Sequence, residues 1–209
     1  MFNLEYNIKT LSCFSLFHIF IIALSNYAVQ FPINLFGFHS TLGAFTFPFI
    51  FLATDLTVRV YGAQAARKII TIGMLPALVV SYIVSIVFFN GDYQGLQGLY
   101  EFNTFVFRIA LASFAAYTIG QVLDIVVFNK LRDLKTWWVA PACSNVFGAA
   151  IDTIVFFSIA FYMSSDAFMA ANWVEIGIVD YFIKIAVALL MFLPLYGVLL
   201  TAISKRIHK

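Results

Sequence analysis

The chain has 209 residues, of which 63% are hydrophobic and only 11% are charged, and its mean hydropathy is +0.96. A water-soluble domain of this length cannot bury so much apolar surface, so the composition predicts an integral membrane protein. The formal net charge of +2 comes from cations in short connections rather than from one basic face, so we predict no binding of nucleic acid.

Six apolar stretches are each long enough to cross the bilayer core, which is about 30 Å thick and needs about 20 helical residues. In chain order we predict spans at 11–31, 40–59, 69–90, 103–128, 137–163 and 174–203. Lipid accepts only helices and closed barrels, and these stretches lack the alternation of barrel strands. The predicted fold is therefore all-α, with six transmembrane helices in a single transmembrane domain over residues 1–209.

The cations predict the orientation of these spans. The first, third and fifth connections contain no Lys or Arg. Ten of the twelve cations lie at the N-terminus, in the second and fourth connections and in the tail: Lys9; Arg59, Arg67 and Lys68; Lys130, Arg132 and Lys135; Lys205, Arg206 and Lys209. The positive-inside rule makes that side cytoplasmic, so both termini are predicted to face the cytoplasm.

Several ionisable residues fall inside the predicted spans, where a charge is tolerated only if it faces the interior of the bundle or water. At 1.5 Å per residue, Asp152 lies about 22 Å from the inner start of the fifth span and Lys184 about 15 Å from the outer start of the sixth. The two can share one level, and Asn26 and Asn145 fall within a few turns of it. Asp152 either pairs with Lys184 or Arg108 to lock helices together, or these groups line a cavity for a polar solute. We favour the cavity.

Other polar residues are interpreted locally. Asp180 and Lys184, like Asp55 and Arg59, have the i,i+4 spacing of a helical ion pair with the acid first. We predict a structural pair at Asp55 and Arg59. Asp124 lies within about two turns of the cytoplasmic exit, where we expect it to be solvated. No cluster has the spacing of a metal site, so we predict no metal and no cofactor.

The sequence contains a weak internal similarity. The segments "ATDLTV" at 53–58 and "AIDTIV" at 150–155 each place an Asp about 15 residues into the second and the fifth span. Halves of three helices have opposite orientations in a membrane, so this similarity fits a 3+3 inverted repeat, which is a plan of many transporters.

The segments 37–70, 144–161 and 179–200, with the cores "ATDLTVRVYG" and "AIDTIVFF", resemble the queuosine precursor transporter family, also called the vitamin uptake transporter family. The resemblance covers essentially the whole chain. It implies a six-helix protein of the cell inner membrane that takes up 7-cyano-7-deazaguanine, 7-aminomethyl-7-deazaguanine or both, for making the modified tRNA nucleoside queuosine.

A substrate of this kind suggests roles for the polar residues. The ring N1–H and the 2-amino group are adjacent donors, which one carboxylate can accept side by side, and Asp152 is our candidate. The ring carbonyl needs a donor, which Lys184, Asn145 or Arg108 can supply, and Phe45, Phe47 or Phe49 can stack on the base. The candidate substrate-binding residues are Asp152, Lys184, Asn145, Arg108, Asn26, Phe47, Asp180 and Asp55.

Two other functions stay open at this point. The chain can be the substrate-binding subunit of an ATPase-energised vitamin uptake system. A membrane-embedded enzyme is disfavoured, because no nucleophile–base pair, metal cluster or pair of acids is apparent in the sequence. We predict a transporter whose partners are a small 7-deazapurine and the lipid bilayer, and small-residue helix faces would permit a homodimer.

Overall fold

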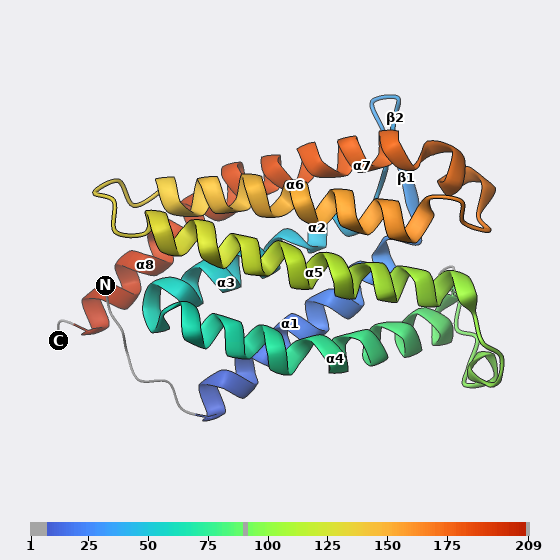
Figure 1. Cartoon of the computed structure of the whole chain (residues 1–209), viewed down its shortest axis with the longest axis horizontal. Helices are drawn as coiled ribbons and strands as arrows, with labels where there is room; N and C mark the ends of the chain where they lie inside the picture. Colours follow the sequence, from blue (N-terminus) through green and yellow to red (C-terminus); the bar gives the residue numbers. More distant parts are fainter. Residues whose placement is uncertain (1–7, 90–91, 208–209) are drawn as a thin grey trace.

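The computed structural model describes residues 8–89 and 92–207, and it forms an elongated bundle of helices (Figure 1). Six helical stretches are long and apolar enough to cross a membrane, which confirms the predicted all-α class and the six spans of a multi-pass membrane protein. The helices are α1 (Ile8–Ala28), α2 (Gly43–Thr46), α3 (Pro48–Tyr61), α4 (Ala63–Val87), α5 (Thr104–Leu131), α6 (Val139–Phe161), α7 (Ala167–Val187) and α8 (Leu193–Ile207).

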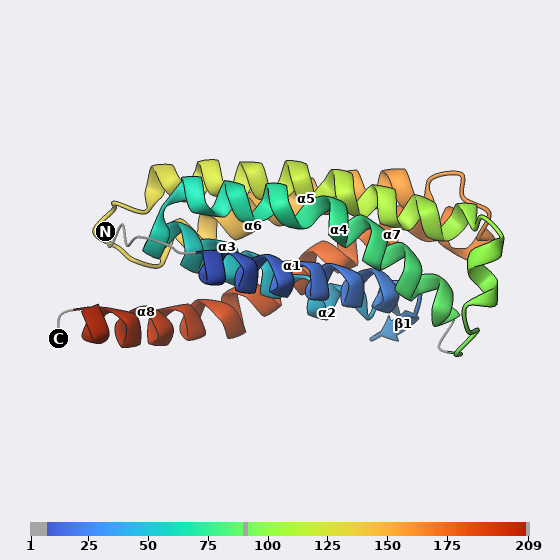
Figure 2. The same cartoon turned by 90° about the horizontal axis from the view of Figure 1, so that it is seen from below.

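The connections predicted to be cytoplasmic lie together. The turn between α3 and α4 and the loop between α5 and α6 are at one end of the bundle, and α8 ends there too (Figures 1 and 2). The loops that follow α1, α4 and α6 are at the other end, which we call the outer end. Lys209 and the side chains of Lys205 and Arg206 lie outside the described part of the chain. The assignment of the first end to the cytoplasm stays a prediction.

The first connection contains a β-hairpin that the sequence analysis did not predict. Strands β1 (Pro32–Leu35) and β2 (Phe38–Thr41) are antiparallel, and their register places Leu35 opposite Phe38. Phe36 and Gly37 both have positive φ angles, of 53° and 91°, as a two-residue type I′ turn requires. Asn34 Oδ1 accepts a hydrogen bond from the Gly37 N–H at 2.9 Å. The hairpin rests against α7, where the backbone N–H and Nδ1 of His39 contact Glu175 Oε1 at 3.2 and 3.1 Å.

Two of the six spans are irregular helices. The second is broken between α2 and α3, where Pro48 begins α3 and supplies no N–H to the preceding turn. The sixth contains the π-helical segment η3 (Ala188–Phe192) between α7 and α8. Here the N–H of Leu193 bonds to Ala188, five residues back, and Pro194 follows without an N–H to restore the regular pattern. Both irregularities border the polar sites described below.

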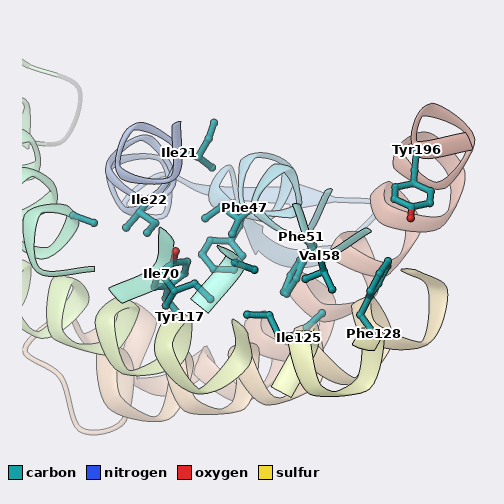
Figure 3. Packing of buried hydrophobic residues seen from close by; sticks show 14 of the residues in the cluster. Ile21, Ile22, Phe47, Phe51, Val58, Ile70, Tyr117, Ile125, Phe128 and Tyr196 are labelled. Carbon is teal, nitrogen blue, oxygen red and sulfur yellow. The ribbon is translucent and has the colours of Figure 1, made fainter. Parts of the chain in front are cut away.

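The buried hydrophobic core joins helices from the whole chain. Figure 3 shows that side chains of α1, α3, α5 and α8 converge on it. Among them are Ile21, Ile22, Phe47, Phe51, Val58, Tyr117, Ile125, Phe128 and Tyr196. Lipid gives no hydrophobic drive for helices to associate, so this close packing and the buried polar contacts must hold the bundle together.

Helices α5 and α6 approach closely through two glycines. A Cβ atom on Gly120 would lie 3.2 Å from the Cβ of Asp152, and a Cβ on Gly148 would lie 3.3 Å from the Cβ of Asp124. Each helix therefore presents a glycine to an aspartate of the other. The spacing is the same in both helices, with the aspartate four residues after the glycine.

Gly148→Ala is expected to lower the stability of the bundle by about 1–3 kcal/mol, because overpacking a filled interface forces its neighbours to move. The added Cβ would lie 3.0 Å from Cε1 of the buried Phe51. Unfolding in detergent measures the effect. Gly73→Ala in α4 is the matched control, since its nearest neighbour would be the Ser15 carbonyl at 3.7 Å. Equal stability of the two variants would contradict the close packing.

Candidate functional site

Three ionisable side chains form a buried cluster between α6 and α7, which we call the ion triad. Lys184 Nζ lies 2.7 Å from Asp180 Oδ2 and 3.1 Å from Asp152 Oδ2. The three residues are only 5%, 2% and 3% exposed. The structure confirms the Asp180–Lys184 pair expected from i,i+4 spacing, and it confirms that Asp152 and Lys184 share one level.

The ion triad lines a small cavity that α1 and α2 close from the other side. The wall contains Ser25, Asn26, Val29, Gly43, Phe47, Ser113, Asp152, Phe156, Phe157, Asp180 and Lys184. The cavity has a volume of about 20 Å³, which is enough for a water molecule. The predicted candidates Asp152, Asp180, Lys184, Asn26 and Phe47 are therefore brought together at one place.

Phe47 and Asn26 reach this cavity through local features of their helices. Phe47 lies at the break between α2 and α3, and the centroid of its ring is 4.9 Å from Lys184 Nζ, within the range of a cation–π interaction. Asn26 donates its side-chain N–H to Ser81 Oγ of α4 at 2.6 Å, which fixes the amide. Gly43 lets α2 approach α1, because a Cβ there would lie 3.0 Å from the Ser25 carbonyl.

The ion triad has an excess of negative charge. Two carboxylates share one ammonium, so the cluster has a net charge of −1 when all three groups are ionised. Asp152 Oδ2 accepts from Lys184, but among the described residues no donor bonds to Asp152 Oδ1. Lys184 also donates to Thr153 Oγ1, but at a long distance of 3.4 Å. The third N–H of its ammonium group is therefore only weakly hydrogen-bonded. The site therefore offers both a free acceptor and an available donor to a polar ligand.

Asp55 and Asn145 lie in a different cluster, nearer the C-terminus of α3 and the N-terminus of α6. Asn145 Nδ2 donates to Asp55 Oδ2 at 3.0 Å, and Ser144 Oγ donates to Asp55 Oδ1 at 3.1 Å. The predicted pair of Asp55 and Arg59 is wrong. Arg59 instead donates to Tyr196 Oη at 2.8 Å and to the Arg132 carbonyl at 2.5 Å, because its side chain extends toward the helix ends.

Asp124 was expected to be solvated, and this prediction is wrong. Its exposed fraction is 0%, and its Oδ1 would be 3.6 Å from a Cβ on Gly148. The residue is close to a helix end in sequence, but α6 covers it because Gly148 has no side chain. The burial of Asp124 is therefore determined by the packing of α6 on α5, and not by the distance of Asp124 from the end of its helix.

Arg108 is also separate from the cavity. It donates to the backbone carbonyls of Ile159 and Tyr162 at 2.8 and 2.6 Å and to that of Met163 at 3.0 Å. These carbonyls are at the C-terminal end of α6, where the last turn has no intrahelical donors and attracts a cation. Arg108 thus stabilises this helix end, and in the described part of the chain no hydrogen bond or ion pair joins it to Asp152.

Sequence reasoning missed the small polar residues of the cavity. Ser25 and Ser113 line it, and Thr153 Oγ1 contacts both Lys184 and Asp180 at 3.4 Å. Single Ser and Thr residues are common on membrane helices, so their type alone did not distinguish them. Only the position of Thr153, directly after Asp152, was a usable signal.

Comparison with known proteins finds a family and relatives that are all named as transporters. A family described as "Putative vitamin uptake transporter" matches residues 41–199. A "Queuosine precursor transporter" of Escherichia coli K12 is 53% identical over 207 residues, covering 99% of this chain and 94% of the relative. A "Probable queuosine precursor transporter" of Haemophilus influenzae is 53% identical over 220 residues, covering 100% of this chain and 94% of the relative.

A more distant relative, a "Probable queuosine precursor transporter" of Bacillus subtilis, is 29% identical over 173 residues and covers 79% of this chain and 74% of the relative. No solved structure matches the chain. The family match spans most of the chain, including α3, α6, α7 and the ion triad. The chain belongs to the vitamin uptake transporter family.

Proposed function

We propose that this chain imports queuosine precursors across the cell inner membrane for tRNA modification, with 7-cyano-7-deazaguanine, 7-aminomethyl-7-deazaguanine or both as substrates. Its family and the names of the relatives support this proposal. The observation that carries it is the ion triad, whose net negative charge is buried at the wall of a cavity beside an aromatic ring. Charged groups inside a membrane protein usually mark a substrate or ion pathway.

The cavity offers the groups that a guanine-like base needs. Asp152 accepts the ring N1–H and the 2-amino group, because each carboxylate oxygen can take more than one hydrogen bond and Oδ1 is available. The ring carbonyl accepts from Lys184, whose bond to Thr153 is long, or from Asn26. Phe47 and Phe156 present aromatic rings to the base. Asn145, Asp55 and Arg108 are not part of this scheme.

Binding requires the cavity to enlarge. Its volume of about 20 Å³ suits a water molecule, whereas sites for small ligands are typically about 300–1,000 Å³. The arrangement therefore corresponds to a closed state, and helices must separate to admit a base. The break between α2 and α3 and the π-helical segment η3 border the polar sites and are suited to act as hinges.

Uptake by the purified chain in proteoliposomes tests this function. We expect labelled 7-deazaguanines to accumulate without another protein. Unlabelled guanine analogues should compete, whereas 7-deazaadenine should not, because adenine lacks both the N1–H and the 2-amino donors that Asp152 accepts. Uptake that occurs only with an added ATPase would instead favour a substrate-binding subunit. Equal competition by the adenine analogue would contradict the role of Asp152.

A further inference from the structure

A second buried polar cluster lies between α3, α5 and α6, and it is distinct from the ion triad. It contains the carboxylates of Asp55 and Asp124, which are 1% and 0% exposed. Both lie against one turn of α6, Asp55 at Ser144 and Asp124 at Gly148. Ser144 and Asn145 donate to Asp55 at 3.1 and 3.0 Å. We call Asp55 and Asp124 the acid pair.

The acid pair has no neutralising cation within ion-pair distance in the described part of the chain. Lys184 is bound in the ion triad, and Arg59, one turn after Asp55, bonds to Tyr196 and to the Arg132 carbonyl. Arg132, at the end of α5, donates to the Val58 carbonyl at 3.1 Å.

Three further titratable groups on the packed helices, Tyr196, His18 and Tyr117, are also engaged elsewhere. Tyr196 of α8 lines a small cavity together with Asp55, but its hydroxyl accepts from Arg59. On the outer side, His18 of α1 and Tyr117 of α5 bond to each other at 2.7 Å. The positive charge of Arg59 acts on Asp55 only from beyond ion-pair distance. Two ionised carboxylates in this position would therefore have no direct ion-pair partner, which is costly inside a membrane protein.

Asp124 adds an independent observation. Neither of its carboxylate oxygens has a partner with hydrogen-bond geometry among the described residues, although both are fully buried. The Ser144 hydroxyl lies near Asp124 but donates to Asp55. Buried polar atoms are almost always hydrogen-bonded, so an unpartnered carboxylate needs an explanation. A bound proton gives one, because a protonated carboxyl group is neutral and carries its own donor.

A small cavity reaches Asp55 of the acid pair from the α7–α8 side. It is lined by Asp55 and Asn145, and also by residues of η3, including Ala188 and Phe192. With a volume of about 10 Å³ it is at the lower limit for a single water molecule. A water at this point would provide the route by which a proton reaches Asp55 when the bundle moves.

We propose that the acid pair is a proton-binding site that couples import to the movement of one proton, an inference that rests on the transport function proposed above. In the closed state the pair holds one proton and one negative charge. When the cytoplasmic end opens, the O–H bond breaks, the proton passes to water, and water solvates both carboxylates. When the outer end opens, a proton from water restores the O–H bond.

The acid pair and the substrate cavity are linked by the same helices. Gly120 packs against Asp152 of the ion triad, and Gly148 packs against Asp124 of the acid pair, so any shift of α5 against α6 changes both sites. Lys184 lies one turn before η3, which lines the small cavity at Asp55. A bound base that draws Lys184 toward itself would therefore also displace η3, which forms part of the cavity wall beside Asp55.

Infrared spectroscopy of the full chain in membranes tests the site without any substrate. At neutral pH we expect the carbonyl-stretch band of a protonated carboxyl group, which Asp124→Asn or Asp55→Asn removes. Asp133→Asn, at an exposed position in the α5–α6 loop, is the control and should retain the band. If the wild-type chain lacks the band, or if neither variant of the acid pair changes it, the proposal is wrong.

Transport in proteoliposomes tests the coupling. We expect a pH gradient, acidic on the side of substrate entry, to raise accumulation several-fold, with proton influx that accompanies substrate. Asp124→Asn should lose this response but keep substrate exchange, because an amide resembles the protonated acid. Accumulation driven by a sodium gradient instead, or exchange that is active but indifferent to pH gradients, would overturn coupling. If the wild-type chain shows no exchange at all, the proposed substrate is wrong, and the infrared band still decides the proton site.

Discussion

Asp152→Asn is expected to weaken uptake of 7-deazaguanines strongly while the protein stays folded in the membrane. The amide replaces a charged acceptor, and a hydrogen bond to a charged group contributes about 1.5–3 kcal/mol, which corresponds to a roughly 10- to 150-fold loss of affinity per bond. The ion triad changes from a net charge of −1 to neutral, and Lys184 keeps its 2.7 Å contact with Asp180. Stability should therefore be preserved when binding is lost.

Initial uptake rates over a range of substrate concentrations measure this effect, and fluorescence-detected size exclusion confirms folding. Asp92→Asn, which removes an exposed carboxylate at the outer end, is the control and should transport normally. If Asp152→Asn imports with wild-type affinity, then Asp152 serves only to pack α6 against α7. The substrate site would then have to be sought away from the ion triad.

Lys184→Met is expected to be the most destabilising change. The methionine fills the space of the lysine stem but leaves Asp152 and Asp180 without a cation at 3% and 2% exposure. Removing one partner of a buried ion pair typically costs about 3–5 kcal/mol, because the remaining charge is uncompensated. The cation–π contact with Phe47 is lost as well. We expect low yield and a lower unfolding temperature in detergent.

Charge balance supplies the test of this explanation. The triple variant Lys184→Met, Asp152→Asn, Asp180→Asn removes all three charges and should recover most of the stability, although it should not transport. Lys130→Met, at an exposed position near the end of α5, is the control and should be as stable as the wild type. A single Lys184→Met variant of normal stability would show that the two carboxylates have other compensation.

The spans were predictable because the requirement for them is local. A bilayer demands about 20 apolar residues in a row, and the stretches that meet this requirement correspond to the six observed spans. The shared level of Asp152 and Lys184 followed from helix rise alone, and the Asp180–Lys184 pair followed from i,i+4 spacing within one helix. Each of these features depends on residues close in sequence.

The pairing between helices was decided by the tertiary structure, because it depends on how each helix is rotated and what packs against it. Asn145 and Asp55 face each other in a second cluster, whereas Asn26 and Phe47 join the ion triad, although depth along the spans did not separate them. Asp124 is buried because Gly148 lets α6 close over it. Composition and spacing thus determined a membrane protein with charges that must be compensated, and helix packing chose the partners, since a charge in low dielectric is stable only beside the groups that the fold brings to it.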